Sequence, residues 1–188
     1  MKLLHLKDVL ENNGLRKGMV DAIKSGAVFI YPTDTVYGIG CDAGNNKSVE
    51  RIRAIKQTKH PLSVIAPSKE WIKNNLNVSS PEYLKKLPGP YTLIFKKKTK
   101  TMLSAASPGN SLGVRVPKHP FTELVSAAGA PFVTTSANIS GQPTIKSTEE
   151  IPKKILEQID FVIDAGTLGG KPSTVIDLTE EKPVFLRK

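Results

Sequence analysis

The chain has 188 residues, of which 39% are hydrophobic, and its 27 Lys and Arg residues against 17 Asp and Glu residues give a formal net charge of +10. This length and apolar content suffice for one ordinary hydrophobic core, so we expect a single domain over residues 1–188. The only cysteine, Cys41, excludes an intramolecular disulfide, and no apolar stretch is long enough for a signal peptide or a membrane span. We therefore expect a soluble cytoplasmic protein with no membrane partner, whose charge favours anionic partners such as nucleotides, pyrophosphate or RNA.

Helical and strand periods alternate along the chain. Leu15, Met19 and Ile23 recur at helical spacing before Gly26, and residues 27–31 have the β-branched and aromatic character of a buried strand. The pattern then predicts a helix ending near residue 56, a strand at 62–66, a helix capped by Ser68 and a short helix from Ser80. Strands at 91–95 and 113–116 follow, then a helix from Pro120 to Gly129 and a strand at 132–135. Ser147 and Glu150 form a capping-box pattern before a further short helix, and the last predicted strands are 161–163, 175–178 and 184–186. This mixed order indicates an α/β fold.

Residues 29–40, Phe-Ile-Tyr-Pro-Thr-Asp-Thr-Val-Tyr-Gly-Ile-Gly, are the most informative stretch. A buried strand leads here into Thr33 and Thr35, whose hydroxyls would be available at the strand end. Gly38 and Gly40 would allow a ligand to approach the backbone closely. A strand followed by an ordinary turn is the alternative reading.

The polar side chains near the predicted strand ends are mostly hydroxyls, amides and cations. The sequence has no carboxylate pair, Cys/His cluster, P-loop or Ser-His-Asp set, so it gives little support to nucleophilic hydrolysis or to a metal bound by protein side chains. Hydroxyls and cations hold phosphates and carboxylates, and adenylyl transfer depends largely on positioning and charge neutralisation. Arg115 lies in the apolar run Leu-Gly-Val-Arg-Val, where an inward arginine needs an anionic partner. Ser136, Asn138 and Ser173 could equally be turn residues.

Five further blocks follow residues 29–40 in a fixed order. They read Ile-Lys-Gln-Thr-Lys-His-Pro-Leu at 55–62, Leu-Pro-Gly-Pro-Tyr-Thr-Leu at 87–93, Leu-Gly-Val-Arg-Val-Pro at 112–117, Thr-Thr-Ser-Ala-Asn-Ile-Ser-Gly at 134–141 and Pro-Ser-Thr-Val-Ile-Asp-Leu at 172–178. Together the blocks resemble the YrdC/YciO family, whose characterised members include threonylcarbamoyl-AMP synthases. The resemblance implies a single-domain YrdC-like fold, a twisted mixed sheet with flanking helices around a central basic cavity.

The resemblance also implies an activity, the conversion of threonine, bicarbonate and ATP to threonylcarbamoyl-AMP and pyrophosphate with the help of Mg²⁺. A downstream tRNA threonylcarbamoyl transferase would then modify adenosine 37 of tRNA. By similarity, the catalytic residues would be Lys56 and Arg115, and threonine would be bound by Thr33, Thr35, Arg115, Ser136 and Ser173. The nucleotide-binding candidates are Lys56, Lys59, His60, Ser111, Asn138, Ser140, Lys146 and Arg187, and no residue is assigned to a metal.

Two departures from the family pattern keep alternatives open. The synthases usually carry Lys-x-Arg before Pro-Leu, whereas residues 56–62 read Lys-Gln-Thr-Lys-His-Pro-Leu, a shorter loop without that arginine. Pro172 precedes Ser-Thr-Val where synthases usually have glutamate, which is similar to the YciO branch. The alternatives are a double-stranded RNA-binding protein and a nucleotide-binding relative without synthase activity. We do not expect the second domain of the longer synthases.

Overall fold

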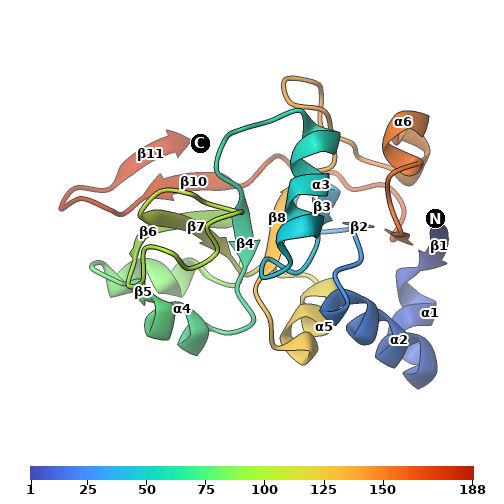
Figure 1. Ribbon diagram of the computed structural model, residues 1–188, viewed down its shortest axis with the longest axis horizontal. Coiled ribbons are helices and arrows are strands. Elements are labelled where there is room, and N and C mark those ends of the chain that lie inside the picture. Colours follow the sequence, from blue (N-terminus) through green and yellow to red (C-terminus); the bar gives the residue numbers. More distant parts are fainter.

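An eleven-stranded mixed sheet runs through the computed structural model, which describes residues 1–188 (Figure 1). The strands are β1 (Lys2–His5), β2 (Phe29–Tyr31), β3 (Gly38–Gly40), β4 (Ser63–Ile65), β5 (Leu76–Asn77), β6 (Tyr91–Lys97), β7 (Ser111–Arg115), β8 (Phe132–Ser136), β9 (Phe161–Asp164), β10 (Thr174–Asp177) and β11 (Val184–Arg187). Their spatial order is β1-β9-β2-β3-β8-β4-β7-β6-β10-β11, with β5 paired to β6. Parallel pairs such as β4–β7 and β6–β10 stand beside antiparallel pairs such as β3–β8 and β6–β7.

The helices follow the signals that the sequence carries. They are α1 (Leu6–Glu11), α2 (Asn13–Lys24), α3 (Asn46–Lys56), α4 (Lys69–Asn75), α5 (Phe121–Ala128) and α6 (Lys153–Leu156), with 3₁₀ turns η1 (Pro81–Lys86) and η2 (Thr148–Glu150). Ser68 caps α4 by accepting the N–H of Trp71 at 3.0 Å, and Gly129 ends α5 in the left-handed conformation. No helix is both long and apolar enough to cross a membrane.

Two hydrophobic clusters lie on opposite faces of the sheet, because successive strand residues point to opposite sides. Ile30 and Val133 belong to a cluster of 30 buried residues, whereas their chain neighbours Tyr31 and Phe132 belong to a cluster of 12. In the smaller cluster Tyr31 stacks on Phe121 of α5, with ring centroids 4.4 Å apart. These observations confirm the predicted twisted mixed α/β sheet with flanking helices.

Three local expectations differ from the structure. The strand β1 and helix α1 were not predicted, and Gly38–Gly40 forms a strand rather than a loop. Ser147 and Glu150 form no capping box, since Ser147 makes no side-chain cap and Glu150 instead accepts the N–H of Lys146 at 2.8 Å. The close approach at Gly40 is made by the chain itself, because a Cβ there would collide with the carbonyl of Val133 and the ring of Phe132.

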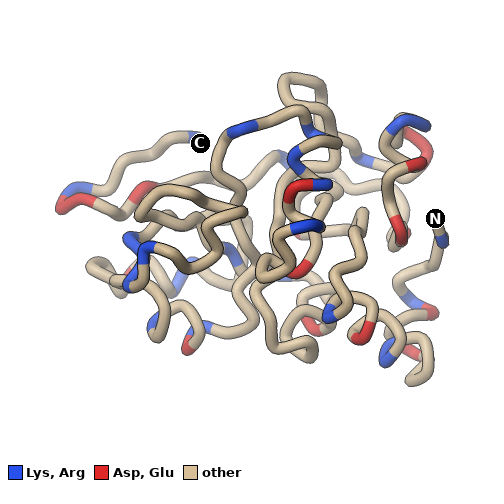
Figure 2. The backbone as a smooth tube through the Cα atoms, viewed as in Figure 1, with Lys and Arg blue, Asp and Glu red and all other residues tan.

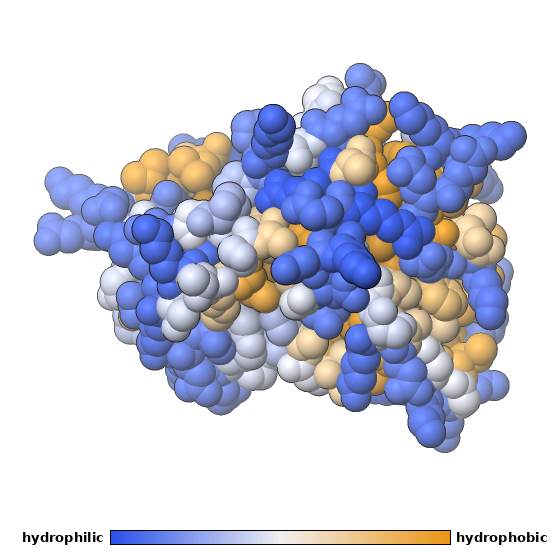
Figure 3. All heavy atoms as spheres, in the orientation of Figure 1, coloured by the Kyte–Doolittle hydropathy of each residue, from blue (hydrophilic) through white to orange (hydrophobic).

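The positive charge of the surface is not concentrated in one patch. Figure 2 shows Lys and Arg on elements across the whole molecule, with Asp and Glu between them. The face in Figure 3 is mainly hydrophilic, with a hydrophobic patch near the position of β11. In that strand Val184, Phe185 and Leu186 are each about half exposed.

Candidate functional site

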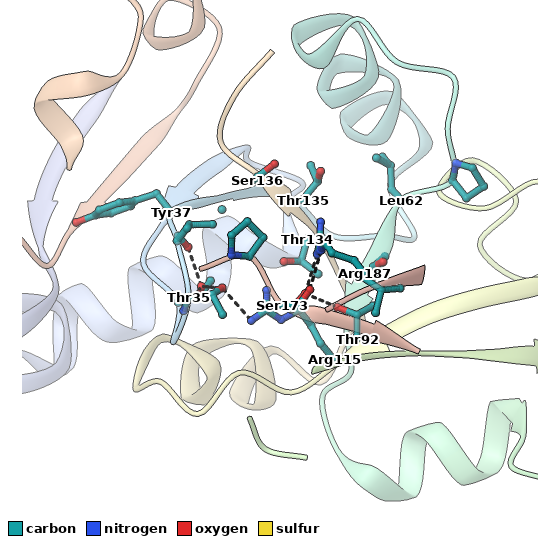
Figure 4. Close-up of a pocket in the computed structure, with 17 residues that line it drawn as sticks. Thr35, Tyr37, Leu62, Thr92, Arg115, Thr134, Thr135, Ser136, Ser173 and Arg187 are labelled. Carbon is teal, nitrogen blue, oxygen red and sulfur yellow. Dashed lines mark hydrogen bonds between the residues drawn. The ribbon is translucent and has the colours of Figure 1, made fainter. Parts of the chain in front are cut away.

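A small polar cavity opens where the ends of eight strands meet (Figure 4). It encloses about 190 Å³ and is lined by 17 residues, of which 4 are hydrophobic. The lining comes from the loop after β2, from the ends of β7, β8 and β11, and from the beginnings of β3, β4, β6 and β10. These strands are spread over almost the full width of the sheet, so the cavity exists only because the sheet twists and curls around it.

Arg115 contributes a buried guanidinium to this cavity. It ends β7, and its Nη2 donates to Asp34 Oδ1 at 2.7 Å and to Thr35 Oγ1 at 3.3 Å. The Nε of Arg115 is buried without any hydrogen-bond partner. An arginine side chain has five N–H donors, so this guanidinium retains donors for a bound anion.

A second guanidinium, that of Arg187, enters the cavity from β11. Its Nε donates to the carbonyl of Ser173 at 2.7 Å and its Nη2 to the Ser173 hydroxyl at 3.1 Å. That hydroxyl also pairs with the hydroxyl of Thr92 at 2.9 Å. Burial, and then repulsion from Arg115, lower the pKa of Arg187. Arg115 and Arg187 both line the cavity, so the two cations face the same small space.

Thr33 and Thr35 form a hydroxyl chain at the end of β2. The Thr33 hydroxyl donates to the carbonyl of Val36 at 2.7 Å and accepts the N–H of Thr35 at 3.1 Å. The Thr33 hydroxyl has only one proton, and it is already donated to Val36. In the contact of 2.9 Å between the two hydroxyls, the Thr35 hydroxyl is therefore the donor. Thr33 therefore orients Thr35, and Gly170 packs so closely on the Thr35 carbonyl that a Cβ there would collide with it.

Lys56 lies at the end of α3 and holds the turn after β8. Its Nζ donates to the carbonyls of Ser136 at 2.7 Å and Asn138 at 2.8 Å, and approaches Asn138 Oδ1 at 3.3 Å. Ser136 in turn donates its hydroxyl proton to Asn138 Oδ1. Burial lowers the pKa of Lys56 to about 8. Ser136 lines the cavity, whereas Lys56 and Asn138 support it from behind.

The structure gathers some of the predicted site residues and separates others. Those that line the cavity are Thr33, Thr35, Arg115, Ser136, Ser173 and Arg187. Ser111 begins β7, at the opposite end of that strand from Arg115 and thus about 13 Å away. Lys59 lines a separate surface groove, while His60, Ser140 and Lys146 are exposed and do not line the cavity. Their nucleotide-binding roles stay predictions.

Sequence analysis missed several polar residues at this site. Thr92 and Thr134 line the cavity from β6 and β8, and Asp34 pairs with Arg115. A signal for Thr92 was its hydroxyl within the apolar strand after Gly-Pro. Asp34 stands between the two predicted threonines, and a carboxylate at that place could have been matched to the inward Arg115.

The cavity therefore offers two cations and several hydroxyls, but no nucleophile. Cys41 is buried in the larger cluster, and this burial raises the pKa of its thiol. No group of three or more His, Cys, Asp or Glu side chains lies together anywhere in residues 1–188. This arrangement can bind a small anion or zwitterion and neutralise negative charge that develops beside it.

Comparison with known proteins places the chain in a family. The Sua5/YciO/YrdC family model, described as "Telomere recombination", matches residues 21–188. A Vibrio campbellii protein named threonylcarbamoyl-AMP synthase is 32% identical over 169 residues, covering 85% of this chain and 91% of that protein.

Two crystal structures are similar to this fold. E. coli YciO has 30% identity and a TM-score of 0.83, covering 94% of this chain and 90% of that one. P. abyssi Sua5 complexed with L-threonine has 31% identity and a TM-score of 0.85, covering 94% of this chain and 54% of that one. This chain thus spans about half the length of that Sua5 chain. By the family model and by these relatives, the chain belongs to the Sua5/YciO/YrdC family.

Proposed function

We propose that this protein is an ATP-dependent L-threonylcarbamoyladenylate synthase, which converts threonine, bicarbonate and ATP to threonylcarbamoyl-AMP and pyrophosphate. The observation that carries the proposal is the pair of guanidiniums, Arg115 and Arg187, facing one small hydroxyl-lined cavity. The synthase name of the Vibrio campbellii relative and the threonine complex of P. abyssi Sua5 support the same activity.

The size of the cavity agrees with an amino acid as its ligand. At about 30 Å³ per water, 190 Å³ corresponds to roughly six waters. Pockets for drug-sized ligands typically exceed about 300 Å³, so a whole nucleotide needs space outside this cavity. Arg115 would take the threonine carboxylate through its free donors, while Thr35, Ser136 and Ser173 surround the rest of the molecule.

ATP would lie beside the threonine with its phosphates toward Arg187. In the reaction the threonine amine would combine with bicarbonate to give a carbamate and water. A carbamate oxygen would then attack the α-phosphorus, and pyrophosphate would leave. The charge that develops on the phosphates is of the kind that a fixed guanidinium stabilises. Asn138, Ser140 and Lys146 are further candidates for the nucleotide.

Mg²⁺ would arrive with the nucleotide. Mg²⁺ is usually held through substrate phosphates and only one or two carboxylates. Asp34, the carboxylate next to the cavity, is already paired with Arg115. The donor set of this site therefore fits Mg²⁺ bound mainly to ATP phosphates.

The product would pass to a tRNA threonylcarbamoyl transferase for modification of adenosine 37 of tRNA in the cytoplasm. This part of the proposal rests on the chemistry of threonylcarbamoyl-AMP, which is a mixed anhydride. Such a product must be transferred by an acceptor enzyme before it is hydrolysed.

A nucleotide- or double-stranded RNA-binding function without synthase activity is the second candidate. Loop 57–62 brings no cation to the cavity, since Lys59 lies in another groove and Lys56 is occupied by backbone carbonyls. The similarity to E. coli YciO over 94% of the chain also favours this candidate.

Pyrophosphate release from ATP and Mg²⁺ separates the two candidates. We expect release only when threonine and bicarbonate are both present, with serine as the substrate control. Arg115→Lys keeps the charge but loses the planar fork, so it should raise the KM for threonine by about 10-fold or more. ATP binding without threonine-dependent release would refute the synthase and favour the second candidate.

A further inference from the structure

Asp34 occupies a position behind the guanidinium of Arg115. It lies in the loop after β2, and its side chain is 11% exposed, against 9% for that of Arg115. The residues on both sides of it, Thr33 and Thr35, line the cavity, as does Arg115, but Asp34 does not. The carboxylate therefore contacts the cation from the protein side.

The two oxygens of Asp34 have separate partners. Oδ1 accepts from Arg115 Nη2 at 2.7 Å, and Oδ2 accepts the backbone N–H of Lys118 at 2.9 Å. The backbone bond prevents rotation of the carboxylate, so the guanidinium is held by an oriented partner. All hydrogen bonds that Arg115 donates within the protein come from Nη2, and Nε is fully buried, which leaves the donors of Nη1 for a ligand.

The Asp34 charge also changes which anion the site prefers. Arg115 and Asp34 together have no net charge, so Arg115 contributes mainly directed N–H donors, and the net positive charge of the cavity comes from Arg187. A dianion is repelled by the fixed carboxylate about twice as strongly as a monoanion at the same distance. A carboxylate with one charge, attached to an ammonium as in an amino acid, suffers least from this repulsion.

We propose that Asp34 is a positioning and specificity-determining residue, which aims the free donors of Arg115 at the ligand carboxylate and disfavours phosphate-type dianions at that place. This inference deepens the proposed function and rests on threonine as the ligand of the cavity. Asp34 acts through Arg115 and does not touch the reacting atoms.

The test is a pair of affinities measured by calorimetry on the full chain, with L-threonine and inorganic phosphate as probes. In Asp34→Asn we expect threonine binding to weaken by about 10-fold or more, because a charge-assisted hydrogen bond that orients Arg115 is lost. Phosphate binding should become tighter, so the ratio of the two affinities changes in a way that simple loosening of the loop would not produce. Asp34→Glu keeps the negative charge, so phosphate binding should stay as weak as in the wild type. The longer side chain should shift the guanidinium of Arg115 and weaken threonine binding.

Asp177→Asn is the matched control. It changes the net charge equally and also removes a carboxylate that accepts a backbone N–H, that of Thr179 at 2.9 Å, but at the far end of β10. Both affinities should stay at wild-type values in this variant. If Asp34→Asn does not fold, Asp34→Ser, which retains an acceptor for Lys118, takes its place.

The outcomes distinguish this inference from the proposed function. Wild-type protein that fails to bind threonine overturns the proposed function, and the inference with it. Wild-type protein that binds threonine, together with an Asp34→Asn variant whose two affinities are unchanged or fall equally, overturns the inference alone.

Discussion

The buried lysines of this protein bind backbone carbonyls and not carboxylates. Lys97 donates to the carbonyls of Met102 at 2.9 Å and Ser107 at 2.8 Å, and its neighbours Lys96 and Lys98 point elsewhere. Lys56 holds the Ser136–Asn138 turn in the same manner. Burial lowers the pKa of both lysines, so each ammonium carries a desolvation cost that its carbonyl contacts offset.

The cost of burying Lys56 should depend on pH. Burial lowers its pKa from 10.5 to about 8, so between these values the unfolded chain binds more protons than the folded chain. The contribution of this lysine to the free energy of unfolding therefore rises with pH through that window. We expect the difference in Tm between wild type and Lys56→Met to grow in favour of wild type from about pH 7 to about pH 9.5. Lys47→Met, on the exposed side of the same helix, should show no such trend, and a pH-independent difference for Lys56→Met would contradict the expectation.

At the scale of elements, the conformation of the loop between β9 and β10 depends on hydrogen bonds from Tyr37, which lies in the loop between β2 and β3. The Tyr37 hydroxyl accepts the N–H of Ala165 at 2.9 Å and lies 2.8 Å from the carbonyl of Gly166, to which it donates. Burial raises the pKa of Tyr37 to about 12, so the hydroxyl keeps its proton at neutral pH. This loop delivers Ser173 to the cavity, and Tyr37, which itself lines the cavity, anchors the loop through its hydroxyl.

Removing the Tyr37 hydroxyl should loosen that loop. Tyr37→Phe is expected to lower the free energy of unfolding by about 1–2 kcal/mol, since it leaves the Ala165 N–H without its partner. Cleavage by thermolysin before Leu168, within the loop, should become faster in the native protein. Tyr83→Phe is the control, and equal cleavage rates in both variants and the wild type would show that the hydroxyl does not anchor the loop.

At the scale of the whole molecule, the two hydrophobic clusters share strands. β2, β4, β8 and β9 each place neighbouring residues in different clusters, as Val64 and Ile65 do in β4. One cluster cannot come apart without exposing the backbone of strands that carry the other. The molecule should therefore unfold as one cooperative unit.

Phe132→Ala tests this coupling. Phe132 is fully buried in the smaller cluster, so its truncation should cost about 3–5 kcal/mol. Trp71, the only tryptophan, packs against the larger cluster and reports on the opposite face. In urea the midpoints from Trp71 fluorescence and far-UV circular dichroism should fall together, whereas the exposed Leu3→Ala should leave both unchanged. An unshifted Trp71 midpoint would mean that the two faces unfold independently.

Local signals in the sequence determined the helices α2, α3, α4 and α5, because caps and helical spacing depend on residues only a few positions apart. Periodicity and turn residues likewise determined most strands, and the ordered motif blocks determined the family. The strands β1, β3 and β5 were missed. β1 is short and terminal, β5 has only two residues, and β3 contains two glycines, whose place in a sheet is set by their neighbours.

Only the tertiary structure decided which polar residues meet. Arg115, Ser173 and Arg187 are distant in sequence and converge because the sheet curls, whereas Ser111, four residues before Arg115, is carried away along the same strand. The sequence marks Thr33 and Lys56 as polar residues at strand and helix ends, but their donors are used within the protein. Residue type determines what a side chain can donate, while strand pairing and sheet curvature determine which partner it reaches.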